Sequence, residues 1–225
     1  MPRPTETALK GRARGLLEAM TARARWIYAV PSDLGAQAAR PIALAAGLLL
    51  EEEEPGALAA RFGNEKGTAS LVTFESPELE VMLLEAQGED APPILADILE
   101  KTGFYAQSTL LGTAIDVRDP EAGKALRTLA HMVVAWDEDW SDLFLLHLAA
   151  PDPMIRHDAV LALTTAVMVA GDAGPAPALL DEAIKREKFP KLKDTMAEAL
   201  NVIRGVTGAP MEISPDAGEE PHSHG

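Results

Sequence analysis

The chain has 225 residues, of which 35 are acidic and 20 basic, so its formal net charge at neutral pH is −15. It contains no cysteine, which excludes disulfides, thiolate catalysis and cysteine-ligated metal sites. The acid excess argues against non-specific nucleic-acid binding, because that needs clustered Lys and Arg. The longest uninterrupted apolar stretch, 42–50, is far shorter than the roughly 20 residues that span a bilayer, and no secretory signal is evident. These features predict a cytoplasmic protein.

The first 40 residues oppose the charge of the rest, with seven basic side chains against three acidic. Apolar residues at helical spacing predict an amphipathic helix over 9–28, whose basic side chains include Arg12, Arg14, Arg23 and Arg25. Three roles stay open for this helix: a cap on the following domain, a partner-binding element, or an attachment to an anionic membrane surface.

The next segment carries four consecutive glutamates, Glu51 to Glu54, which are typical of a solvated helix end or turn. The alternative is an acidic patch that receives the basic N-terminal helix or a partner. The composition of 63–70 predicts a loop. Residues 71–74 have the composition of a strand, but an isolated strand cannot found a sheet.

A proline recurs at the start of predicted helices, at positions 41, 77, 120, 153 and 190. The spacing of 33 to 43 residues is typical of stacked helical hairpins. The last two units align best, at an offset of 37. Each has a helix before it, over 139–149 and 175–187. The turn between the first pair is so short that the two helices must be antiparallel neighbours.

The segment from Asp152 to Leu163, Asp-Pro-Met-Ile-Arg-His-Asp-Ala-Val-Leu-Ala-Leu, resembles the second helix of a HEAT-type repeat. The resemblance is clearest over 139–204. It implies an all-α fold, a short solenoid of four or five antiparallel helical hairpins without a substantial sheet, and a scaffold or adaptor role. We therefore expect a basic helix and connection over 1–40, a HEAT-like domain over 41–206 and a disordered acidic tail over 207–225.

Two tryptophans flank three acids in the stretch Trp136, Asp137, Glu138, Asp139 and Trp140. Tryptophan is enriched at binding hot spots, so this stretch is a candidate anchor for a basic partner. The structural alternative is that Trp136 ends one helix and Trp140 opens the next, with acids at its positive N-terminus.

The sequence offers no catalytic, cofactor-binding or metal-ligating motif. No histidine has an acid or a second histidine three or four residues away in a helix, and neither a P-loop nor a Gly-x-Ser-x-Gly motif is present. We therefore predict a non-enzymatic adaptor that binds a basic partner protein through an acidic helical surface, without cofactor, metal or nucleic acid. The alternatives are an inhibitor that neutralises a basic partner, and an enzyme whose carboxylates converge from distant helices.

Overall fold

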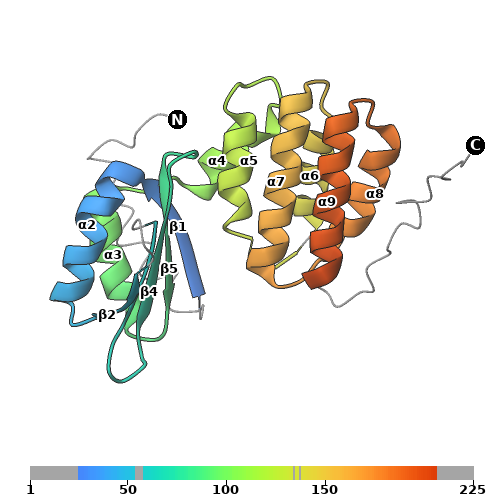
Figure 1. The fold of residues 1–225 in the computed structure, drawn as a ribbon. Coiled ribbons are helices and arrows are strands. Elements are labelled where there is room, and N and C mark those ends of the chain that lie inside the picture. Colours follow the sequence, from blue (N-terminus) through green and yellow to red (C-terminus); the bar gives the residue numbers. More distant parts are fainter. Residues whose placement is uncertain (1–24, 54–57, 134, 137, 207–225) are drawn as a thin grey trace, which may run out of the picture.

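A computed structural model describes residues 25–53, 58–133, 135–136 and 138–206, apart from the side chain of Glu138. It consists of a sheet half followed by a helical half (Figure 1). The elements of the sheet half are β1 (Arg25–Pro31), α2 (Ser32–Ala45), β2 (Leu49–Glu53), β3 (Ala59–Gly63), β4 (Ser70–Ser76), β5 (Val81–Gln87) and α3 (Ala91–Thr102). The helical half contains α4 (Gln107–Ile115), α5 (Ala122–Ala130), α6 (Glu138–Leu148), α7 (Pro153–Ala170), α8 (Ala176–Arg186) and α9 (Pro190–Val206).

The five strands form one antiparallel sheet in the order β1-β5-β4-β3-β2. Strands β2 to β5 follow one another as a meander. Strand β1 pairs with β5, although α2 and strands β2 to β4 separate the two in the sequence. The predicted loop over 63–70 is confirmed as the turn between β3 and β4. In that turn the Asn64 side chain accepts hydrogen bonds from the backbone N–H groups of Thr68 and Ala69.

One face of the sheet is covered by α2 and α3, as Figure 1 shows. The side chains of this face alternate along each strand with those of the opposite face, as the pleat requires. They pack with the apolar faces of the two helices into a core that includes Trp26, Val30, Phe62, Leu84 and Leu95.

The helical half has its own core, built from α4 to α9 and centred on Phe144, Leu126, Leu129 and Leu163. Helices α6 and α7 form one hairpin, and α8 and α9 form the next. The predicted helices 139–149 and 175–187 are thus confirmed to within one or two residues. Asp152 caps α7 as its side chain accepts from the Met154 N–H at 2.8 Å, with Pro153 in the first turn.

The second face of the sheet meets the helical half near β1 and β5. Ala29, Leu79, Val81 and Leu83 are buried there against Tyr105 and Met132. Ion pairs surround this contact: Arg127 binds Glu78 with two hydrogen bonds of 2.6 Å, and Lys124 binds Glu80 at 2.5 Å. No helix in the described part of the chain is both long and apolar enough to cross a bilayer.

The all-α solenoid expectation is wrong, because residues 25–87 contain a five-stranded sheet. The physical reason lies in β5, Val-Met-Leu-Leu-Glu-Ala-Gln, which is central in the sheet and buried on both faces over most of its length. Such a strand has a continuous apolar run instead of an alternating one, and its Met, Leu, Glu and Ala also favour helices. The prediction that residues 71–74 form a strand is confirmed within β4, whereas the helix predicted from Pro77 is a turn followed by β5.

Four further local predictions are corrected in the sheet half. Arg25 to Tyr28, expected at the end of the N-terminal helix, belong to β1. Glu51 to Glu53 form part of edge strand β2 instead of a helix end or turn. Pro41 lies inside α2, which begins nine residues earlier at Ser32, and Pro77 lies in a turn before β5. Residues 9–24 of the predicted helix over 9–28, and the predicted tail over 207–225, fall outside the described residues.

Candidate functional site

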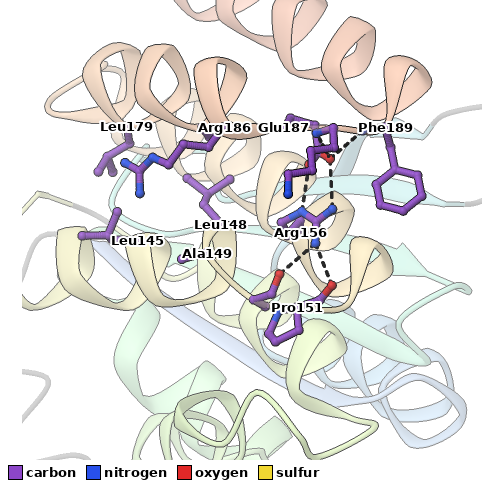
Figure 2. Close-up of a pocket in the computed structure, with 12 residues that line it drawn as sticks. Leu145, Leu148, Ala149, Pro151, Arg156, Leu179, Arg186, Glu187 and Phe189 are labelled. Atoms are coloured by element: carbon purple, nitrogen blue, oxygen red, sulfur yellow. Dashed lines mark hydrogen bonds and ion pairs between the residues drawn. The ribbon is translucent and has the colours of Figure 1, made fainter.

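One concave site lies at one end of the helical half, where α6 ends, α7 begins and α8 turns into α9 (Figure 2). This α8–α9 groove has a volume of about 410 Å3. Its walls come from both helical hairpins. The lining residues are Leu145, Leu148, Ala149, Ala150, Pro151, Arg156, Leu179, Ala183, Arg186, Glu187, Lys188 and Phe189.

One side of the groove is aliphatic. Leu145 and Leu148 come from the last turns of α6, and Leu179 and Ala183 come from one face of α8. Leu148 is buried in the helical core, whereas Leu145 is 39% exposed. The core-facing stripes of α6 and α8 therefore continue onto the surface here, where no described residue covers them.

The opposite side is fixed by Arg156, whose guanidinium lies at the centre of Figure 2. Its Nε and one terminal nitrogen donate to the two carboxylate oxygens of Glu187, at 2.8 and 3.0 Å. The other terminal nitrogen donates to the carbonyls of Ala150 and Pro151, at 2.8 and 2.9 Å. A planar guanidinium is suited to such a fork of bonds. Arg156 therefore ties the α6–α7 turn to the α8–α9 turn.

Glu187 completes this arrangement. Its carboxylate also accepts from the backbone N–H groups of Lys188 and Phe189, at 2.8 and 2.9 Å. The hydrogen bond from Arg156 is the main reason that the pKa of Glu187 is lowered below its usual 4.5, and the backbone donors act in the same direction. The side chain is 1% exposed, and these donors satisfy its charge inside the wall of the groove.

The turn between α8 and α9 is basic and carries an exposed aromatic ring. We define the basic turn as residues 185–193, Lys-Arg-Glu-Lys-Phe-Pro-Lys-Leu-Lys, with five basic side chains and one acid. Phe189 is 53% exposed, and its ring lies 5.7 Å from the Arg156 guanidinium. Lys185 and Arg186 pair with Glu182. Among the described residues, Lys188, Lys191 and Lys193 have no ion-pair partner.

No family model, curated protein or solved structure matches this chain. The role of the groove therefore rests on its own chemistry. That chemistry is an aliphatic surface, a wall whose charges neutralise each other, and a rim of exposed lysines beside a phenylalanine.

The two tryptophans of the predicted anchor lie at the start of α6 and do not line the α8–α9 groove. Trp136 and Trp140 both lie near Phe144, with ring centroids 5.8 and 6.4 Å from that of Phe144. The Trp136 Nε1 donates to the carbonyl of Asp172 at 2.7 Å, so this ring ties the α5–α6 connection to the α7–α8 turn. Both rings are partly buried against the helical core. Trp140 lies in the first turn of α6, as the structural alternative expected, whereas α5 ends at Ala130 and Trp136 lies in the connection instead of at a helix end.

The acids between the tryptophans and the predicted arginines are described only in part. Asp139 is exposed at the start of α6, whereas Asp137 and the side chain of Glu138 are outside the described residues. Arg12, Arg14 and Arg23 also lie outside them. Arg25 binds Glu85 with two hydrogen bonds, at 2.8 and 2.9 Å, and donates to the Val169 carbonyl at the end of α7. Arg25 therefore joins the two halves of the molecule.

Two other cavities lie where the sheet meets the helical half. A polar cleft of about 470 Å3 contains Ser32, which donates to Glu75, and the Lys124–Glu80 pair. An apolar hollow of about 240 Å3 is lined by residues of the second sheet face, including Phe74, and by His131 and Val169. Burial is the main reason that the pKa of His131 is lowered to about 4, and the charge of Arg127 adds to it. In the described part of the chain, no three potential ligands are grouped to hold a metal ion.

The residues of the α8–α9 groove are not among those predicted from the sequence. A signal was present, because five basic residues within nine positions interrupt the acidic part of the chain that follows the first 40 residues, and they enclose a phenylalanine. The sequence contains no comparable signal for the aliphatic side of the groove. Leu145 and Leu179 belong to ordinary amphipathic stripes, and only the packing of the hairpins shows which leucines remain uncovered.

Proposed function

We propose that the protein is a non-enzymatic interaction module and that the α8–α9 groove receives a segment of a partner protein. The observation that carries the proposal is the combination of exposed Leu145 and Phe189 around a groove whose wall is braced by Arg156. A braced wall loses little conformational entropy on binding, and exposed apolar side chains gain most from being covered.

The ionisable groups of the groove support binding more than catalysis. Arg156 and Glu187 satisfy each other and the adjacent backbone, so neither is positioned to exchange a proton with a ligand. Arg186 pairs with Glu182. The polar cleft at Ser32 has a carboxylate beside the hydroxyl, but the residues lining it include no histidine that could act as a general base.

The same helices support the relation to HEAT-type repeats, which we retain as a proposal for residues 139–204. Asp152 and Arg156 are the motif positions that carry the resemblance. Asp152 caps α7, and Arg156 connects one hairpin to the next. Bracing between successive hairpins is what a stacked repeat requires, because each unit buries its apolar face against its neighbour.

Site-specific photo-crosslinking tests the proposed role of the groove. A photoreactive amino acid replaces Leu145 in the full chain, which is expressed in its own cells, and crosslinked products are identified by mass spectrometry. The matched control carries the same group in place of Val202, which is 51% exposed on α9 and does not line the groove. We expect a specific product from position 145 and none from position 202. Equal products from both positions, or none from either, would contradict the proposal.

A groove-filling variant provides a second test. Ala149 is exposed and lines the groove, so Ala149→Trp should fill it without disturbing the core. Ala197→Trp adds the same side chain at an exposed position of α9 outside the groove and serves as the control. The crosslinked partner should be lost from Ala149→Trp and retained by Ala197→Trp.

A second candidate is the acidic edge of the sheet, which keeps the prediction of a basic partner. Residues 25–106 hold 14 acidic and five basic side chains, a net charge of −9. Residues 151–206, in contrast, hold eight acidic and seven basic side chains and are nearly neutral. Strand β2 lies at the end of the sheet order with Leu49 54% exposed and three glutamates. An edge strand of this kind can add a basic extended segment, although charged edges also prevent unwanted pairing.

Co-purification at low and high salt tests this second candidate. A basic partner on β2 should be released by high salt and weakened by Glu52→Lys. Glu65→Lys makes the same charge change in the exposed β3–β4 turn and is the control. A partner that survives Glu52→Lys, or that is equally weakened by Glu65→Lys, would rule out the edge as its site.

A further inference from the structure

We propose that the partner segment in the α8–α9 groove is acidic and inserts one bulky apolar side chain between Leu145 and Leu179. The proposal names the partner of the groove and so rests on the proposed function. It reverses the charge expected for the partner from the overall composition.

The first support is the charge around the groove. The basic turn has five basic residues, and its single acid, Glu187, is neutralised by Arg156. Lys188 lies on the lining, and Lys191 follows in the first turn of α9. Both are exposed and without an ion-pair partner among the described residues. Unpaired ammonium groups on a protein whose net charge is −15 attract an acidic segment and orient it toward this end of the molecule.

The second support is the aliphatic side of the groove. Leu145, Leu148, Leu179 and Ala183 form a surface without a hydrogen-bonding side chain, so a polar segment alone would leave it uncovered. A leucine, isoleucine or methionine side chain would fill it, and Phe189 would cover the adjacent part of the segment. Acidic residues on both sides of this apolar residue would then lie near Lys188 and Arg186.

Nucleic acid would present negative charge as well, but the groove suits it poorly. Single-stranded nucleic acid is bound by several stacking aromatics in a continuous basic groove. The groove lining includes one aromatic ring, Phe189, and its side opposite Arg156 is aliphatic. Asp181, Glu182 and Asp194 also lie close to the basic turn along the chain and would repel an extended phosphodiester backbone.

Fluorescence anisotropy with the full chain and labelled synthetic peptides tests the proposal. The probe is the nonapeptide Glu-Asp-Glu-Glu-Leu-Glu-Asp-Glu-Glu. One matched peptide replaces the central Leu by Ser, and another replaces every acid by Lys. We expect the acidic Leu peptide to bind, the Ser peptide to bind about tenfold more weakly because the aliphatic side stays uncovered, and the Lys peptide not to bind.

Charge-reversal variants locate the interaction. Lys188→Glu with Lys191→Glu should weaken binding of the acidic Leu peptide by at least tenfold. Lys66→Glu with Lys101→Glu changes the net charge equally on the sheet half and should change binding by less than about twofold. The milder pair Lys188→Gln with Lys191→Gln should give an intermediate loss, and it keeps the test valid if the reversed pair folds poorly.

Several results would overturn the proposal. Equal weakening by both charge-reversed pairs would mean that the peptide senses only net charge. Tighter binding of a single-stranded oligonucleotide of equal charge would assign the basic turn to nucleic acid. Self-association abolished by Lys188→Glu with Lys191→Glu would assign the groove to a second copy of the chain. If position 145 crosslinks to a segment that is not acidic, the proposed function stands and the inference about the partner fails. If position 145 gives no specific crosslink, the proposed function fails.

Discussion

Replacing Arg156 by Ala should destabilise the protein by about 3 kcal/mol. The side chain is 13% exposed, and the change removes all four of its hydrogen bonds. It leaves the carboxylate of Glu187, which is 1% exposed, without its cation. Breaking a buried pair in this way costs about 3–5 kcal/mol. We expect the lower end because the backbone N–H groups of Lys188 and Phe189 still bind the carboxylate.

Urea unfolding followed by circular dichroism measures this cost. For a chain of this size, about 3 kcal/mol corresponds to a fall in Tm of roughly 6–12 °C. The double variant Arg156→Met with Glu187→Met should be less destabilised than the sum of the two single variants, by about 1–3 kcal/mol, because no uncompensated charge remains. A loss below about 1 kcal/mol for Arg156→Ala, or additive effects in the double variant, would refute the assignment of this pair as the brace of the groove.

The same pair has a defined pH dependence. Because Arg156 lowers the pKa of Glu187 in the folded state, the stabilisation is fully present above the ordinary glutamate value of 4.5. It is lost as the pH falls through the lowered folded-state value. The difference in unfolding free energy between the original protein and Arg156→Ala should therefore be constant from pH 8 to pH 5 and should shrink below 4.5. A difference that shrinks above pH 5 would require another group.

Three further predictions concern other parts of the fold. The pKa of His131 is lowered from 6.5 to about 4, so folding favours its neutral form. The resulting stabilisation should be complete above pH 6.5 and should be lost as the pH falls toward 4, by up to about 3 kcal/mol. His131→Gln should reduce this loss, as measured by urea unfolding at each pH. Gly35→Ala should destabilise the protein by about 1–3 kcal/mol, because the added Cβ would approach Val30 to 2.8 Å. Gly112→Ala, inside α4, should instead stabilise it by up to about 1 kcal/mol in thermal melts, because nothing lies within 4 Å of the added Cβ. Trp136→Phe should cost about 1 kcal/mol in urea by removing the 2.7 Å hydrogen bond to the Asp172 carbonyl, and an unchanged unfolding midpoint would contradict that role.

The sequence was most informative where structure depends on neighbouring residues. Asp152 and Pro153 mark the start of α7 because a side-chain cap and a missing N–H act within one turn of the helix. The short turn after α6 made that helix and α7 neighbours. The loop between β3 and β4 followed from its composition, because glycine, asparagine and threonine satisfy a tight turn locally.

Tertiary structure decided the rest, because strand pairing and surface exposure depend on residues far apart in the chain. The segment Val81–Gln87 is a strand because β1 and β4 bind both of its edges, and β1 lies more than 50 residues earlier. Likewise, Leu145 and Leu179 look like core positions in isolation, and only the packing of the two hairpins brings them together in the lining of a groove beside the Arg156–Glu187 pair. Composition and local pattern therefore determined the β3–β4 loop, the cap of α7 and the C-terminal helices. The sheet and the groove came from long-range packing, in which partners outweigh local preference.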